Sequence, residues 1–208
     1  MASPDRVVDF PTLWVSLDWV QQHCVVPDGP YKGDPFELAD WQAWALLNFY
    51  RVKPTANPDE NATAFHYRRS QIVRPQKAGK APYTAAHVCV EGVGPALFAG
   101  WAEGGETWDC RDHGCGCGFV YEYEPGEPMG RHWPTPLIQI TATSEDQTDN
   151  IYDALRPMID DGPLHELIPK TGEAFIRLPR KGRIDVVTSN ARSRLGQRVT
   201  FAPQDETG

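Results

Sequence analysis

The sequence predicts an α/β protein with a three-layer core around a mainly parallel sheet, which we expect to be incomplete at its C-terminal edge. Three observations indicate this fold class. Short apolar segments alternate with segments of helical periodicity along most of the chain. The pair Gly79-Lys80 stands before a predicted helix, and the last apolar segment, residues 199–202, leads to Asp205 and Glu206. These positions favour a ligand site at the carboxyl ends of the strands.

The first half of the chain predicts two helices and then a strand–loop–helix unit. Residues 10–23 carry apolar side chains at helical spacing. A second helix is predicted over residues 39–50, with Asp40 as its N-cap. Residues 65–73 are predicted as a strand leading into the glycine-lysine pair, and residues 84–93 suit the helix that follows it.

The second half of the chain predicts the rest of the sheet. Residues 96–101 and 137–143 are apolar enough for buried strands. Residues 144–147 form a capping signal for a helix that continues to Ile159. Three short apolar segments complete the predicted sheet, the first two of them as a β pair: residues 175–178, 184–188 and 199–202.

Composition limits the possible functions. The 208 residues suffice for one well-buried domain, and the net charge of −8 excludes a protein that holds DNA by overall positive charge. A basic stretch, residues 177–198, holds seven lysines and arginines and one acid, and it fits either a phosphate-binding surface or a solvated one. No segment has the apolar length of a membrane span. The odd number of cysteines, five, favours a reduced, cytosolic protein.

Residues 74–81 contain most of a phosphate-binding loop. Backbone N–H groups at the start of a helix and one mobile cation, Lys80, suit the phosphates of a nucleotide. The other half of such a site needs carboxylates that hold the metal ion and orient the attacking water. Asp205 can hold Mg²⁺, and Glu206 can orient the water. The sequence therefore predicts a P-loop nucleoside triphosphatase that uses Mg²⁺ with ATP. The alternative is a solvated loop lysine and an acidic pair on the surface.

Four segments, in this order, resemble the large terminase subunits of tailed double-stranded DNA phages: Trp41-Gln42, the Gly79-Lys80 loop, residues 139–147 and the terminal acidic pair. The resemblance covers about residues 35–208 and corresponds to the N-terminal ATPase half of these DNA-packaging motors. It implies an ATP hydrolase that drives DNA into the capsid. It also implies that the family's nuclease is a separate domain, which we do not expect in this chain.

We accordingly divide the chain into an N-terminal helical segment, residues 1–34, and an ATPase domain, residues 35–208, with a Gly/Cys-rich insertion at about residues 102–133. As partners, the resemblance implies double-stranded DNA, the small terminase subunit and the portal protein, together with a homo-oligomer on the portal. It implies a location in the host cytoplasm and no association with a membrane.

The resemblance also implies roles for single residues. Gln42 matches a glutamine that reads adenine, since an amide offers a donor and an acceptor to the base edge. Lys80 matches the lysine that neutralises β- and γ-phosphate charge. The acidic pair matches the magnesium ligand and the catalytic base. Arg194 matches an arginine finger aimed at a neighbouring subunit, a role for which Arg192 competes.

The predicted loop departs from the family's pattern at two positions. Arg74 replaces the opening glycine, and Ala81 replaces the serine or threonine whose hydroxyl binds magnesium. Thr84 carries the next aliphatic hydroxyl, almost one helical turn away. Either Asp205 and water hold the metal, or the loop binds nucleotide poorly. The predicted nucleotide-binding residues of the loop are Pro75, Gln76, Lys77, Ala78, Gly79, Lys80 and Ala81.

Soft metal ligands gather within eight residues of the insertion: Cys110, His113, Cys115 and Cys117. Such ligands suit tetrahedral Zn²⁺, although the Cys-x-Cys spacing is tighter than that of most zinc sites. The alternative is a glycine-rich hairpin with reduced thiols. Two other functions therefore stand beside the ATPase motor. One is a catalytically weak nucleotide-binding or scaffold fragment, and the other is a zinc-stabilised binding module.

Overall fold

Four strands form the main sheet: β5 (Leu137–Ala142), β6 (Phe175–Arg177), β7 (Arg183–Thr188) and β8 (Gln204–Asp205). Their order is β6-β7-β5-β8. β5 runs parallel to both β7 and β8, whereas β6 is antiparallel to β7, as expected for a predicted β pair. The computed structural model describes residues 9–142, 145–172, 175–188 and 198–205. The protein therefore has a mixed α/β fold.

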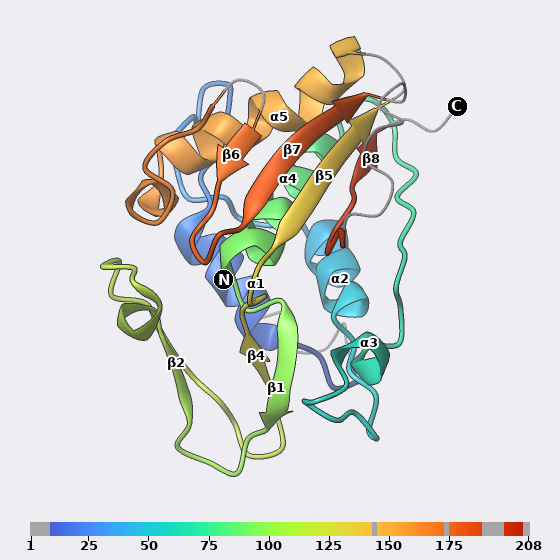
Figure 1. Cartoon of the computed structure of the whole chain (residues 1–208), viewed down its shortest axis with the longest axis vertical. Coiled ribbons are helices and arrows are strands. Elements are labelled where there is room, and N and C mark those ends of the chain that lie inside the picture. Colours follow the sequence, from blue (N-terminus) through green and yellow to red (C-terminus); the bar gives the residue numbers. More distant parts are fainter. Residues whose placement is uncertain (1–8, 143–144, 173–174, 189–197, 206–208) are drawn as a thin grey trace.

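Two long helices cover one face of this sheet. α4 (Lys80–Val93) and α5 (Glu145–Asp160) pack against each other and against β5, and they lie behind the sheet in Figure 1. Ile138 and Ile140 of β5 are fully buried, while Leu137, Gln139 and Thr141, which alternate with them, are half-buried. Since strand side chains alternate between two faces, the isoleucines belong to the face that the helices cover. Among the described residues, the long helices thus supply one helical layer rather than the two predicted.

Two shorter helices extend the core beyond α4. α1 (Trp14–His23) packs against both α2 (Asp40–Phe49) and α4, and its buried side chains belong to the same hydrophobic core as those of α4. The N-cap of α2 is Ala39, one residue before the predicted Asp40. None of the helices that the structure describes has the length and apolar character needed to cross a membrane. The remaining helices among the described residues are short: α3 (Asn61–Ala64), η1 (Cys110–His113) and η2 (Pro163–Glu166).

Two small antiparallel sheets lie below the main sheet in Figure 1. β1 (Leu97–Trp101) pairs with β4 (Pro128–Arg131), and β2 (Thr107–Asp109) pairs with β3 (Val120–Glu122). The predicted strand at β1 is therefore present, but it belongs to a separate pair of strands. The second pair, with η1 between its strands, lies within the predicted Gly/Cys-rich insertion.

The strand predicted over residues 65–73 is wrong. Residues 66–79 contain no strand, and Phe65 makes only an isolated bridge, with Val52. Alternation predicts an extended backbone, but a strand also needs a neighbour at hydrogen-bonding distance. The helix after the loop is present as predicted, and it begins earlier, at Lys80.

The last strand is shorter than predicted and lies farther along the chain. β8 contains only Gln204 and Asp205, while Phe201 makes an isolated parallel bridge with β5. The amide of Gln139 donates to the Phe201 carbonyl (3.0 Å), so the residues before β8 already run beside β5. Pro203 has no N–H to donate, so a hydrogen bond is missing from the ladder between Phe201 and β8.

Candidate nucleotide site

Gly79 lies within the predicted phosphate-binding loop, residues 74–81, directly before α4. It is the N-cap of the helix and has a left-handed conformation with φ of 81°. Glycine adopts this conformation without the steric cost that a Cβ brings. A Cβ at this position would lie 3.1 Å from Nε2 of Gln42. Glycine therefore permits both the turn into the helix and the close approach of α2.

Three contacts hold the loop in place. The Arg74 guanidinium lies over the ring of Trp41, 4.8 Å from its centroid. Nε2 of Gln42 donates to the Gly79 carbonyl (3.1 Å). Nζ of Lys80 donates to the Arg74 carbonyl (3.1 Å), which closes the loop from its end back to its beginning. The three residues that follow Arg74 are exposed, so a ligand can reach this side of the loop.

Gln42 lies beneath the loop rather than on the surface. Only 5% of the residue is exposed. Its Oε1 accepts from the Ala39 amide (2.8 Å), and its Nε2 donates to Gly79. Both polar ends of the side chain thus have protein partners, while the second N–H of Nε2 and the second lone pair of Oε1 leave capacity for a further hydrogen bond. The structure gives Gln42 a positioning role, and its adenine contact stays a prediction.

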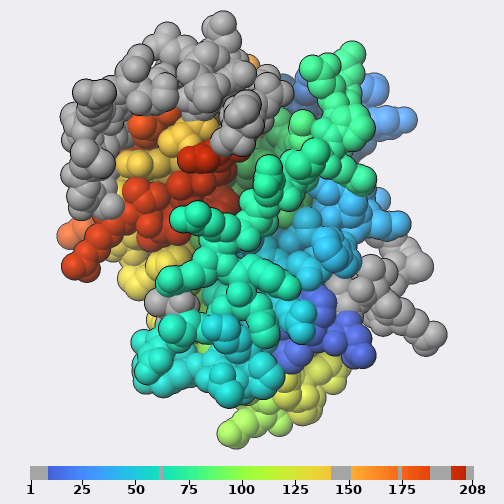
Figure 2. Space-filling view, turned by 90° about the vertical axis from the view of Figure 1, so that its right-hand side faces the viewer, coloured from blue at the N-terminus to red at the C-terminus, as the bar shows by residue number. Residues whose placement is uncertain are grey.

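A groove of about 1390 Å³ extends from the loop along α4. One face of the helix lines it, because Lys80, His87 and Glu91 are separated by whole turns. Residues 67–74 line one side of the groove, and residues 198–204 line another. Figure 2 shows this face of the molecule, with the extended segment in teal crossing it beside residues 198–204 in red.

The strand that leads to the predicted acidic pair ends beside this groove. Asp205 pairs with Ala142 at the carboxyl end of β5. Gln204, the residue before it, lines the groove together with Lys80. The groove therefore borders Lys80 at the start of α4 and Gln204 of β8, whereas Asp205, Gly79 and residues 75–78 are not among the residues that line it. Three residues with predicted roles lie outside the described residues: Arg192, Arg194 and Glu206.

The basic stretch does not form one phosphate-binding surface in the part of it that the structure describes. Arg180 is half-buried, and its Nε donates to the Trp133 carbonyl (3.1 Å). Arg183 forms an ion pair with Asp185, with 2.8 Å between nitrogen and oxygen. Arg198 is exposed and lines the groove. Among the described residues of this stretch, Arg198 alone lines the groove, which Arg68, Arg69 and Arg74 also line.

A buried carboxylate lies farther along the groove. Glu91 is 4% exposed; its Oε1 accepts from the Tyr50 hydroxyl (2.5 Å) and its Oε2 from the Trp133 indole (2.8 Å). Burial raises the pKa of Glu91 to about 7, although both hydrogen bonds lower it. His87 lies 4.0 Å away, and burial lowers its pKa to about 3, so it is neutral and forms no ion pair. Sequence reasoning missed this pair, whose signal was two polar residues inside the apolar segment 85–93.

We expect the Glu91→Gln substitution to change how stability depends on pH. The folded-state pKa of Glu91, about 7, exceeds its ordinary value of 4.5. Its stabilising contribution is therefore complete below about pH 4.5 and is lost as the pH rises through about 7. Relative to the variant, the wild type should lose roughly 3 kcal/mol of unfolding free energy across this range, measured by urea denaturation.

The comparison with the variant is needed because His87 changes the pH dependence of the unfolding free energy in the opposite direction. Its pKa is lowered from 6.5 to about 3, so its contribution is complete above pH 6.5 and is lost as the pH falls toward 3. The glutamine keeps the size of the side chain and leaves His87 in place. Parallel stability curves for the two proteins would show that Glu91 does not titrate in this range.

The cysteines of the insertion meet a histidine from another part of the chain. The resulting group, the Cys/His cluster, consists of His23, Cys110, Cys115 and Cys117. The predicted ligand His113 lies outside it; its ring stacks on Trp108 with 3.9 Å between centroids. The predicted set is thus corrected at one position. His23 ends α1, and the local spacing that drew attention to the cysteines carries no signal for it.

Comparison with solved structures identifies the fold. No protein-family model matches the chain. The crystal structure of the HK97 bacteriophage large terminase matches 93% of this chain with a TM-score of 0.58, at 18% sequence identity. The chain has the fold of a phage large terminase. The terminase resemblance read from the sequence is therefore confirmed at the level of the fold.

Sequence relatives of this terminase-like chain also come from phages. The Gene 13 protein of Mycobacterium phage D29 is 30% identical over 93% of this chain, and that of Mycobacterium phage L5 is 26% identical over the same share. The chain spans 31% of the length of each relative and 31% of the HK97 terminase chain. It thus corresponds to about a third of these longer proteins.

Proposed function

We propose that this chain is the ATP-binding and ATP-hydrolysing part of a viral DNA-packaging motor. The observation that carries the proposal is the groove, whose lining includes Lys80, the first residue of α4, and Gln204, the residue before Asp205 in β8. A nucleoside triphosphate needs a cationic side chain and backbone N–H donors on one side, and carboxylates that hold its metal ion on the other. The fold likeness to the HK97 large terminase supports the same function.

The loop residues are proposed to hold the phosphates. Nζ of Lys80 now donates to the Arg74 carbonyl, 3.1 Å away, and a phosphate oxygen on the same side of the loop can replace that acceptor. Backbone N–H groups in the first turn of α4 are further donors, because a helix start leaves them without helical partners. Pro82 contributes none, since proline lacks an N–H.

The acidic pair is proposed to serve the hydrolytic step. Asp205 is the residue that would hold the magnesium ion of MgATP, which neutralises phosphate charge when bound. Glu206 is proposed to orient the attacking water and take its proton. Arg194 is proposed as the arginine finger that one subunit supplies to the next.

Hydrolysis is proposed to drive double-stranded DNA into the capsid. In this proposal the chain acts as a homo-oligomer on the portal protein, with the small terminase subunit, in the host cytoplasm. We expect the chain on its own to hydrolyse ATP weakly, because a monomer lacks the arginine that a neighbour supplies.

A second candidate is a nucleotide-binding segment with little catalytic power. One observation favours it: Ala81 has no hydroxyl for the metal, and the Thr84 hydroxyl donates to the Lys80 carbonyl (3.0 Å) and so serves the helix. Asp205 would then be the sole metal ligand among the predicted residues. The proposed function and this candidate differ in turnover, not in nucleotide binding.

The test combines binding and turnover. Titration with MgATP, followed by calorimetry, should show binding that EDTA abolishes, and phosphate release should be slow but dependent on magnesium. Plasmid DNA incubated with the chain and magnesium or manganese should stay intact. No binding at millimolar MgATP would overturn the proposal, binding without turnover would favour the second candidate, and DNA cleavage would contradict the proposed division of activities.

A further inference from the structure

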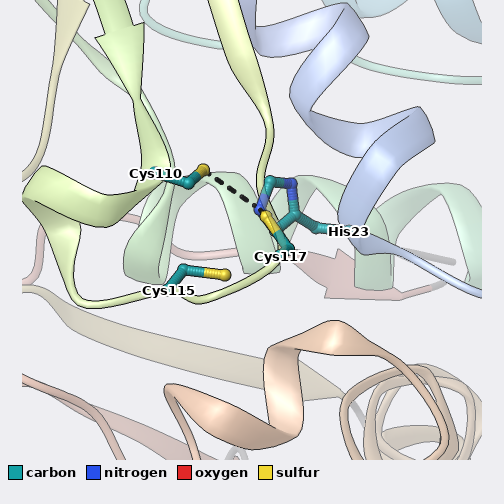
Figure 3. A group of neighbouring side chains, drawn as sticks. All are labelled: His23, Cys110, Cys115 and Cys117. Carbon is teal, nitrogen blue, oxygen red and sulfur yellow. Dashed lines mark hydrogen bonds between the residues drawn. The ribbon is translucent and has the colours of Figure 1, made fainter.

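We propose that the Cys/His cluster is a structural zinc site with three thiolate ligands and one imidazole ligand. It joins the β2–β3 hairpin to the end of α1, two segments that lie far apart in the sequence. Figure 3 shows the four side chains directed toward one another: His23 from α1, and Cys110, Cys115 and Cys117 from the hairpin.

The distances fit a tetrahedral ion. Nε2 of His23 lies 3.3 Å from Sγ of Cys110 and 3.2 Å from Sγ of Cys117, and all four ligand atoms lie within 4.8 Å of one another. In a tetrahedral zinc site, bonds of about 2.3 Å to sulfur and 2.0 Å to nitrogen place the nitrogen about 3.5 Å from each sulfur. Small side-chain shifts therefore suffice to centre an ion among these atoms.

The imidazole of His23 is oriented as a metal ligand. Its Nδ1 lies 2.8 Å from the Trp19 carbonyl. A carbonyl oxygen can only accept, so Nδ1 carries the hydrogen and the lone pair of Nε2 faces the sulfurs. Trp19 also stacks on the imidazole at 4.4 Å, and Phe119 meets it edge-on at 5.6 Å. Metal-binding histidines commonly have such a carbonyl partner, which fixes the tautomer and the ring.

The backbone of the hairpin brings the three sulfurs together. The Cys115 amide donates to the Cys110 carbonyl (3.0 Å), which closes the turn around η1. Gly114, at φ of 83°, and Gly118, at φ of 78°, supply the left-handed angles that reverse the chain on either side of Cys115 and Cys117. The Phe119 amide lies 3.5 Å from Sγ of Cys117 and points to it as a donor, an arrangement that favours a thiolate.

The site is closed, which indicates a structural and not a catalytic ion. Four protein ligands complete a tetrahedron and leave no position for water or substrate. The hairpin strands are only three residues long each, and a hairpin of this size is marginally stable alone. Zinc bound at the cluster would fix it to α1, with a second attachment where the Gly116 amide donates to Glu166 of η2 (2.9 Å).

The test is elemental analysis of the 208-residue chain purified without added metal. About one zinc per chain is expected in the wild type. His23→Ala should lower the zinc content about fivefold or more, whereas the control His113→Ala should leave it unchanged. A strong chelator should lower the melting temperature of the wild type and leave that of His23→Ala unaffected. Cobalt bound to the wild type in place of zinc should give the intense visible absorption of a tetrahedral thiolate site.

Three outcomes would overturn the proposal. The first is a wild-type chain without zinc that also gives no cobalt spectrum, a result that does not depend on any variant folding. The second is a disulfide between two of the three cysteines in the purified protein, detected by mass spectrometry after alkylation. The third is equal zinc loss in His113→Ala and His23→Ala, which would make His113 a ligand. None of these results bears on ATP hydrolysis.

Discussion

The Lys80→Ala variant is expected to hydrolyse MgATP on the order of 10²-fold more slowly than the wild type, or to lose measurable turnover. Lys80 is the first residue of α4, its side chain lines the groove, and its Nζ already reaches across the loop to the Arg74 carbonyl. Alanine removes the cation that is proposed to meet the β- and γ-phosphates. Phosphate release at saturating MgATP measures the effect.

Binding should be measured in the same variant, because turnover of the wild-type chain is expected to be slow. Calorimetric titration should show MgATP affinity weakened about tenfold or more. Lys170→Ala is the matched control, since Lys170 is exposed and does not line the groove. Equal affinity and turnover in Lys80→Ala and Lys170→Ala would show that the glycine-lysine pair is not a phosphate-binding loop.

Local sequence patterns predicted the four longest of the described helices and four of the eight described strands, β1, β5, β6 and β7. The helix after the loop begins at Lys80 because Gly79 can adopt the left-handed angle that precedes it. The β pair near the C-terminus follows from two short apolar segments joined by a turn. In both cases the residues that determine the structure lie close together in the sequence, so the sequence pattern alone predicts the element.

Pairing between distant segments could not be predicted in this way. An apolar pattern shows that a segment can be a strand, but not which neighbour it has. The segment at β1 therefore seemed to belong to the main sheet, whereas it pairs with β4. Residues 66–75 likewise have no neighbouring strand to form a ladder with, for the same reason. The last strand was placed too early because the apolar residues 199–202 make only an isolated bridge, at Phe201, and the paired strand follows Pro203.

The candidate site shows the same division. The loop, with Gly79 and Lys80, has a local signature, and it was found from the sequence. The buried pair of His87 and Glu91 has only a weak one, two polar residues in an apolar segment, because polar residues in a helix are ordinary until their burial is known. His23 joins the cysteines only through the packing of α1 against the rest of the core. His113 was favoured by nearness in sequence, but its ring stacks on an indole instead.

The Glu206→Gln variant is expected to bind MgATP like the wild type and to lose about 10²-fold or more of its turnover. Glutamine keeps the size of the side chain but cannot take a proton from water, so substrate binding and the chemical step should separate. Glu206 follows Asp205, the last residue of β8, and itself lies outside the described residues.

The matched control for this variant is Glu122→Gln, because Glu122 is an exposed glutamate at the end of β3 and does not line the groove. It should change neither binding nor turnover. Asp205→Asn should differ from both variants in MgATP affinity. Loss of the proposed metal ligand should weaken the binding of MgATP and make that binding less dependent on magnesium. If Glu206→Gln turns over ATP as fast as Glu122→Gln, then Glu206 is not the catalytic base. If Asp205→Asn also binds MgATP normally, the acidic pair lies outside the site, and the groove would have to hold nucleotide through Lys80 and the loop alone.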